Sequence, residues 1–150
     1  MRQASQESNV GNDDAGTSIA DANAGAVRRA FTALSANDFA ALAGLFHRDA
    51  AWYTPGRSAV ACEALGRDAV FARFARYGRE TGGSFRMILK KVLQSADGSV
   101  VAIHHDSGER NGKRLDAGCC TVFDFEEGLI LEGSDHFHDL YNWDEFWSQT

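Results

Sequence analysis

The stretch that decides the fold is residues 84–138, SFRMILKKVLQSADGSVVAIHHDSGERNGKRLDAGCCTVFDFEEGLILEGSDHFH. It contains four runs of strand-like residues with a period of two, over residues 84–94, 99–108, 114–125 and 129–138. The dipeptides that separate them are Asp97-Gly98, Asn111-Gly112 and Glu127-Gly128. Asn-Gly between two strand-like runs is the strongest short hairpin signal. The stretch therefore predicts a four-stranded antiparallel meander.

Helical periodicity precedes this meander. From Ile19 onward, apolar residues recur every three or four positions, which predicts a helix to about Ser35. A second, shorter helix with Asn37 as its N-cap is expected to carry Phe39, Leu42, Leu45 and Phe46. A short strand over residues 50–54, a loop around residue 62 and a third helix from about 66 to 82 follow. An aromatic terminal turn is predicted at residues 141–147.

Composition excludes several classes of partner. The 150 residues carry 15 Lys and Arg against 21 Asp and Glu, a net charge of −6, whereas nucleic-acid binding needs a basic face. No apolar run approaches the roughly 20 residues that span a bilayer. Residues 1–18 lack an apolar targeting segment and are predicted to form a flexible tail before a single domain at 19–150. We therefore expect a cytoplasmic protein that binds neither nucleic acid nor membrane.

The order of these elements resembles the cone-shaped fold of the nuclear transport factor 2-like superfamily, which includes ketosteroid isomerase, scytalone dehydratase, limonene epoxide hydrolase and the SnoaL-like polyketide cyclases. The fragments that carry the resemblance are FHRDAAWYTPG (46–56), GRDAVFARF (66–74), TGGSFR (81–86), ERNGKRLD (109–116), FDFEEGLILE (123–132) and DLYNWDEFW (139–147). The chain looks closest to the SnoaL-like members. The resemblance implies an α+β fold in which three N-terminal helices pack in a curved, mostly antiparallel sheet around an apolar cavity.

The last predicted strand offers one candidate catalytic carboxylate. Leu131, Gly133, Asp135 and Phe137 share one face, which is more apolar than the face of the alternating residues. If that face points inward, Asp135 is a single carboxylate on an apolar wall, and burial raises its pKa toward the range useful for proton transfer. The same position resembles the acid or base carboxylate of the SnoaL-like cyclases.

Three further candidates follow from the resemblance. Periodicity does not choose a face for residues 99–108, but the resemblance places His104 and Asp106 inward, where the epoxide hydrolases carry Arg-x-Asp. An imidazole between two carboxylates is a competent proton carrier near neutral pH. Tyr53 is expected at the cavity mouth beside Trp52, with its phenol available to a substrate carbonyl, as tyrosines are in scytalone dehydratase and ketosteroid isomerase.

The remaining expectations concern ligands and assembly. The predicted lining residues are Trp52, Phe31, Phe74, Phe123 and Phe137. His136 and His138 share the outward face of their strand, so we expect neither a metal site nor a cofactor.

Two functions stay open. The first is a cofactor-free acid/base catalyst, such as a cyclase, isomerase, dehydratase or hydrolase, acting on a small apolar, polyketide-like carbonyl or epoxide. The second is a non-catalytic module that binds a small apolar ligand or dimerises. A homodimer through the outer sheet face is expected in either case, with Trp143, Phe146 and Trp147 as possible anchors.

Overall fold

The computed structural model describes residues 18–149, so nearly all of the predicted tail lies outside the described residues. Within them, the helices are α1 (Ile19–Ser35), α2 (Phe39–Ala43), α3 (Arg67–Glu80) and α4 (Leu140–Trp147). The strands are β1 (Phe46–Thr54), β2 (Cys62–Leu65), β3 (Arg86–Gln94), β4 (Val100–Arg110), β5 (Lys113–Glu126) and β6 (Leu129–Phe137). None of these helices is both long and apolar enough to cross a bilayer.

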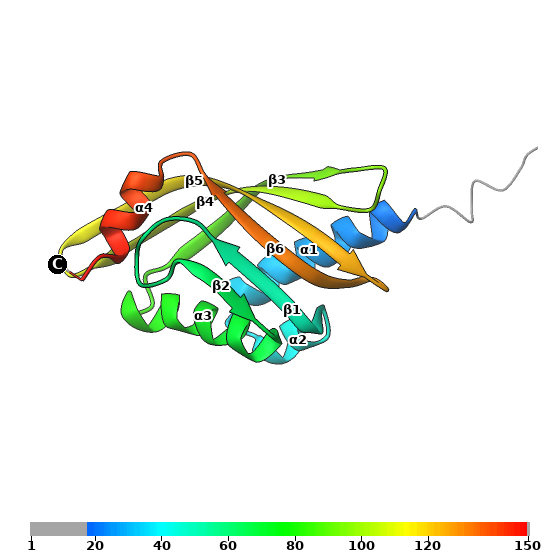
Figure 1. Ribbon diagram of the computed structural model, residues 1–150, viewed down its shortest axis with the longest axis horizontal. Coiled ribbons are helices and arrows are strands. Elements are labelled where there is room, and N and C mark those ends of the chain that lie inside the picture. Colours follow the sequence, from blue (N-terminus) through cyan, green and yellow to red (C-terminus); the bar gives the residue numbers. More distant parts are fainter. Residues whose placement is uncertain (1–17, 150) are drawn as a thin grey trace, which may run out of the picture.

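The strands form one curved sheet in the order β2-β1-β6-β5-β4-β3, with α1 and α3 packed on the same side of it (Figure 1). Strands β3 to β6 pair as the predicted antiparallel meander. Strand β1 pairs with β6 in parallel, which joins the N-terminal part of the chain to the end of the meander. The predicted α+β class, with helices packed in a curved and mostly antiparallel sheet, is confirmed.

The second helix is shorter than predicted. It ends at Ala43, and Phe46 instead starts β1, because the Leu45 carbonyl accepts a β6 amide and Phe46 pairs with β6. Asn37 is not the N-cap, since it adopts a left-handed φ of 52° after α1. Asp38 is the N-cap, and its side chain accepts the Ala41 amide at 3.0 Å.

The predicted terminal turn is helix α4, and the predicted loop at residue 62 contains the edge strand β2. Asp139 caps α4 by accepting the Asn142 amide at 3.0 Å. Trp143, Phe146 and Trp147 follow helical spacing and are almost completely buried in the protein's own core. The hypothesis that these three side chains anchor a dimer is therefore wrong, because helix formation turns them inward.

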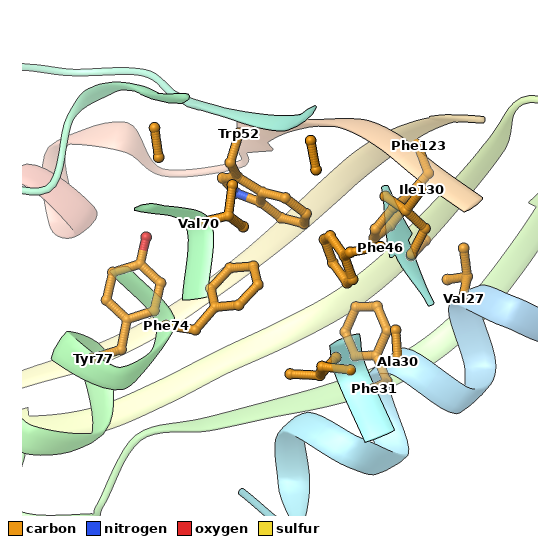
Figure 2. Packing of buried hydrophobic residues seen from close by; sticks show 14 of the residues in the cluster. Val27, Ala30, Phe31, Phe46, Trp52, Val70, Phe74, Tyr77, Phe123 and Ile130 are labelled. Atoms are coloured by element: carbon orange, nitrogen blue, oxygen red, sulfur yellow. The ribbon is translucent and has the colours of Figure 1, made fainter. Parts of the chain in front are cut away.

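Aromatic side chains fill the space between the helices and the sheet (Figure 2). The Trp52 ring of β1 lies 4.9 Å from the ring of Phe74 and 5.6 Å from that of Phe123, measured between centroids. The same indole covers Gly133 of β6, where an added Cβ would come within 2.2 Å of a ring carbon. Only glycine leaves room for the indole beside the strand.

This contact predicts the effect of two matched substitutions. Gly133→Ala is expected to lower the free energy of unfolding by about 1–3 kcal/mol, because Trp52 must leave its place. Gly118→Ala, in the neighbouring strand β5, adds a methyl group that meets only ordinary contacts at 3.7 Å and should not destabilise. Urea denaturation of both variants checks the prediction, and equal stabilities would contradict it.

Candidate active site

Four polar side chains meet in the interior of the sheet. The inward-facing residues of β4 include His104 and Asp106, as predicted, and β6 directs Asp135 to the same side. Thr121 of β5 lies directly opposite Asp135 in the strand register. All four side chains are buried, Asp135 with a relative exposure of 7%. The structure thus brings together three of the predicted site residues and adds a threonine between them.

Hydrogen bonds join the four side chains into a chain. The imidazole of His104 contacts Asp106 Oδ1 through Nδ1 at 2.6 Å and Thr121 Oγ1 through Nε2 at 2.8 Å. The Thr121 hydroxyl lies 2.9 Å from Asp135 Oδ1. The order is therefore carboxyl, imidazole, hydroxyl, carboxyl.

The number of protons that these hydrogen bonds need determines the net charge of the four side chains. Three hydrogen bonds need three protons, whereas a neutral His104, the Thr121 hydroxyl and two ionised carboxylates supply only two. One more proton is required, on the imidazole or on a carboxyl group. Moving the bonding protons together along the chain relocates that proton between Asp106 and Asp135 without moving a heavy atom. The arrangement can therefore store a proton and deliver it at either end.

Asp135 has two further hydrogen-bond partners, both from β1. Its Oδ2 accepts from the Trp52 indole at 2.9 Å and from the Thr54 hydroxyl at 3.2 Å. The Thr54 oxygen in turn accepts from the Arg73 guanidinium of α3 at 3.3 Å. The Arg73 guanidinium is thus linked to the Asp135 carboxyl group through the Thr54 hydroxyl, and its positive charge favours the ionised form of that carboxyl group.

Burial dominates the electrostatics of the cluster. Loss of water raises the pKa of Asp135 above its ordinary value, while the hydrogen bonds from Trp52 and Thr121 act in the opposite direction. Burial likewise raises the pKa of Asp106, against the effect of His104. Both carboxyls therefore hold a proton more readily than an exposed aspartate does, as the proton count requires.

The predicted lining aromatics leave little free space beside the cluster. The Phe31 ring packs on the imidazole of His104 at 5.2 Å, and the Trp52, Phe74 and Phe123 rings contact one another. Instead of one deep cavity, a cavity of about 80 Å³ opens between α1, α3 and β3. A wider hollow of about 440 Å³ lies at the C-terminal ends of β1 and β6, and Asp135 and Phe137 contribute to its wall.

Tyr53 occupies the opposite face of β1 from Trp52, because successive side chains of a strand alternate. It therefore does not lie beside Trp52 as predicted. It is half-buried and lines the wider hollow together with Asp135. The hydrogen-bonded chain does not include it.

One group of possible metal ligands exists among residues 18–149. The ligand atoms of His104, Asp106 and Cys119 lie within 4.8 Å of one another. Both imidazole nitrogens already have hydrogen-bond partners, and burial raises the pKa of the Cys119 thiol, which disfavours the thiolate that a metal needs. These residues fit a hydrogen-bond network better than a metal centre. His136 and His138 are exposed, as predicted.

Sequence reasoning missed the side chains that connect the site. Thr121 shares its predicted inward face with Phe123, and counting back from the Asn111-Gly112 turn places it beside the strand of His104. That signal was available. Thr54 lies on β1, and Arg73 and Tyr77 lie on α3. No local sequence pattern places these residues near Asp135.

Comparison with known proteins identifies the family. The SnoaL-like domain profile matches residues 27–133. The chain belongs to the SnoaL-like family. Bal32a, from a soil-derived mobile gene cassette, is 52% identical and superposes with a TM-score of 0.85 over 86% of this chain and 98% of its own. An uncharacterised protein of Mycobacterium tuberculosis is 30% identical over 85% of this chain and 98% of its own.

More distant structures share the fold. TerC, crystallised with polyporic acid, is 18% identical with a TM-score of 0.72 and covers 83% of this chain and 97% of its own. Membership of the SnoaL-like family, stated from the sequence as a resemblance, is confirmed by the profile match. The fold is shared with a nuclear transport factor 2-like protein of Burkholderia pseudomallei, which is 19% identical with a TM-score of 0.73 and covers 84% of this chain and 97% of its own.

The raised pKa of Asp135 predicts a pH dependence of stability. The folded protein keeps this proton to a higher pH than the unfolded chain, where the ordinary value is 3.8. Stability conferred by the protonated form is therefore lost as the pH rises above about 4 toward the folded pKa. Asp135→Asn lacks this proton, so its free energy of unfolding should fall less steeply over that range. Urea denaturation at several pH values checks this, and identical slopes for both proteins would contradict it.

Proposed function

We propose that this protein is a cofactor-free acid/base catalyst that moves a proton on a small apolar carbonyl or epoxide, in a cyclisation, isomerisation, dehydration or hydrolysis. The observation that carries the proposal is the buried chain from Asp106 through His104 and Thr121 to Asp135. A buried carboxyl group whose pKa is raised holds a proton more readily than an exposed one, which suits it to general acid or base catalysis.

In the proposed mechanism, Asp135 exchanges the proton with the substrate. When Asp135 gives up a proton, the Thr121 hydroxyl and the His104 imidazole shift theirs in the same direction and replenish it. Asp106 fixes the orientation of the imidazole and stabilises its charged form. The ionised and neutral forms of Asp135 both keep hydrogen-bond donors from Trp52 and Thr54, so the group can cycle without a large rearrangement.

The substrate class is inferred from the surroundings. The wider hollow that includes Asp135 has a volume of about 440 Å³, within the range of roughly 300–1,000 Å³ of small-molecule sites. Its lining combines apolar residues such as Phe137 and Leu140 with Tyr53 and with polar residues that include Glu63 and His136. TerC, which shares the fold, was crystallised with polyporic acid, which supports a small organic molecule as the occupant.

Conservative substitutions of Asp106 and Asp135, the two ends of the hydrogen-bonded chain, test this function. Deuterium incorporation next to the carbonyl of small cyclic ketones in D2O, followed by NMR, and hydrolysis of small cyclic epoxides supply the rates. Asp135→Asn is expected to lower the rate of the reactive substrate by roughly 10²- to 10⁴-fold, because it removes the exchangeable proton and nearly preserves the volume. Asp106→Asn should lower it less, since that residue acts through His104.

The chain contains a matched control. His105 and Asp116 form a hydrogen-bonded pair on the outer face, where Asp116 is exposed. Asp116→Asn makes the same chemical change outside the cluster and should leave the rate at its wild-type value. A rate unchanged in Asp135→Asn, or lowered equally by the outer-face substitution, would contradict the proposed mechanism, and the protein would then be the binding module.

We also propose a homodimer through the outer face of the meander. Ile88 and Leu93 of β3 are each 50% exposed, and Ile103 and Val122 continue the apolar surface across β4 and β5. A second copy of the same face would cover these side chains.

Charge placed on this face should separate the subunits. The double variant Ile88→Glu, Leu93→Glu is expected to sediment as a monomer, because two desolvated carboxylates would oppose association. Leu65→Glu alters a leucine that is 64% exposed on β2, at the other edge of the sheet, and should leave the dimer intact. Analytical ultracentrifugation checks both, and a monomeric wild-type protein would contradict the proposal.

A further inference from the structure

A half-buried arginine of α3 carries its charge close to the site without an acidic partner. Within residues 18–149, no carboxylate oxygen lies within 4.0 Å of the Arg73 guanidinium. Arg76 of the same helix, in contrast, contacts Glu80. The side chain that Arg73 does contact is Thr54, whose oxygen lies 3.3 Å from Nη1. Because burial reduces the screening by solvent, this charge acts on its neighbours more strongly than an exposed one.

Arg73 closes the base of the hairpin between β1 and β2, against which α3 packs (Figure 1). Nη1 donates to the Cys62 carbonyl at 2.8 Å, and Nη2 donates to the Ala61 carbonyl at 3.4 Å. Thr54 and Cys62 are partners in the strand register. These bonds therefore fix the guanidinium beside the last residue of β1.

The arginine also determines the direction in which the Thr54 hydroxyl donates. A hydroxyl has one proton, and a guanidinium can only donate. Because Arg73 donates to Thr54 Oγ1, the hydroxyl keeps its own proton for Asp135 Oδ2, which lies at 3.2 Å. The positive charge polarises the hydroxyl and so strengthens its bond to the carboxylate.

The two carboxyl groups of the hydrogen-bonded chain are not equivalent. Asp135 accepts hydrogen bonds from three side chains, of which Trp52 and Thr54 both bind Oδ2. In the described part of the chain, the carboxyl group of Asp106 has one hydrogen-bond partner, His104. Donors to a carboxylate favour its ionised form, and so does a nearby cation. The additional proton is therefore held more firmly at the Asp106 end.

The groups around Asp135 leave Arg73 as a charge that does not titrate. The titratable and charged groups that face Asp135 are His104 and Asp106 of β4, Cys119 of β5, and Arg73 and Tyr77 of α3. Burial raises the pKa of Tyr77 and of Cys119, so both stay neutral. Arg73 opposes the rise in the pKa of Tyr77, which indicates that its charge acts on this interior.

We propose that Arg73 is a positioning residue that acts through Thr54: it keeps the Asp135 carboxyl group ionised in the resting protein and so holds the shared proton on His104 and Asp106. The inference deepens the proposed function and rests on it for the use of that proton. Asp135 is then ready to accept a proton before it donates one.

Carboxyl-carbon NMR of protein labelled in its aspartate side chains tests this assignment. The Asp135 signal is identified by its loss in Asp135→Asn, and in the wild-type protein it should be that of an ionised group at neutral pH. Arg73→Met should raise the pKa of Asp135 by about 1, the lower end of the effect of a nearby opposite charge, because the guanidinium is only half-buried and acts through a hydroxyl. Arg73→Lys keeps the charge and should retain most of the wild-type value.

Arg76 supplies the matched control. It lies one turn further along α3 and donates to the Ala59 carbonyl of the same hairpin at 3.1 Å, and in the described structure it does not bond to Thr54. Arg76→Met removes an equal charge and should leave the pKa of Asp135 unchanged. Asp144 of α4 holds this loop as well, by accepting the Arg57 amide at 3.0 Å, so the loop keeps an attachment in either variant.

A double-mutant cycle tests the route through the hydroxyl. Thr54→Val removes the link, so Arg73→Met should raise the pKa of Asp135 less in that background than in the wild-type protein. Equal effects in the two backgrounds would show that Arg73 does not act through Thr54.

Three other results would overturn the inference: a neutral Asp135 in the wild-type protein at neutral pH, an unchanged pKa in Arg73→Met, or an equal rise in Arg76→Met. These titrations need no substrate. Failure of the proposed function, seen as an unchanged rate in Asp135→Asn, is therefore distinguishable from failure at Arg73.

Discussion

Two carboxyl groups in an aromatic interior cannot both be ionised at low cost, and the arrangement of this protein's centre follows from that constraint. Each lacks the water that would stabilise its charge, and burial raises the pKa of both. His104 and Thr121 lie between them and carry the hydrogen bonds that let the pair share one additional proton. The constraint that makes the cluster costly to bury also makes its proton transferable. For this reason we propose the cluster as the acid/base group.

The sheet topology supplies the groups that surround Asp135. Because β1 pairs with β6 in parallel, Trp52 and Thr54 reach the carboxyl group from the neighbouring strand. The indole can lie there only because residue 133 is glycine. Helix α3 completes the arrangement from the other layer, since Arg73 donates a hydrogen bond to Thr54 and Tyr77 lines the narrower cavity. Substitutions in β1, β6 or α3 should therefore change the surroundings of the Asp135 carboxyl group.

Membership of the SnoaL-like family establishes the architecture and leaves the chemistry to individual side chains. The relatives of higher identity include an uncharacterised mycobacterial protein, so the substrate must be argued from this chain's own cavities. The aromatic core bears on that argument. The Phe31 ring packs against His104, and the Phe123 ring packs against Phe31. These rings exclude water from the cluster, which strengthens the hydrogen bonds within it.

The sequence by itself determined the meander and placed Asp135 on the more apolar face of its strand. Both depend on local rules: glycine turns set the hairpins, and a period of two sorts the residues of a strand into an apolar and a polar face. The hairpin at Asn111-Gly112 continues without irregularity, so the positions of β4 relative to β5 could be counted from the turn. The order of the quoted fragments also carried the resemblance to the family, since that order survives where individual residues change.

Only the tertiary structure decided which side chains meet Asp135. An irregularity between Asp124 and Phe125 shifts the pairing of β5 with β6 by one residue, so Thr121, and not Cys120, lies opposite the carboxyl group. Counting from the turn cannot reveal a bulge. The choice of which face of β1 points inward, the burial of the α4 tryptophans and the position of Tyr77 likewise depend on packing between segments far apart in the chain. Local propensity contains no information about such contacts, because their energy arises only when the layers come together.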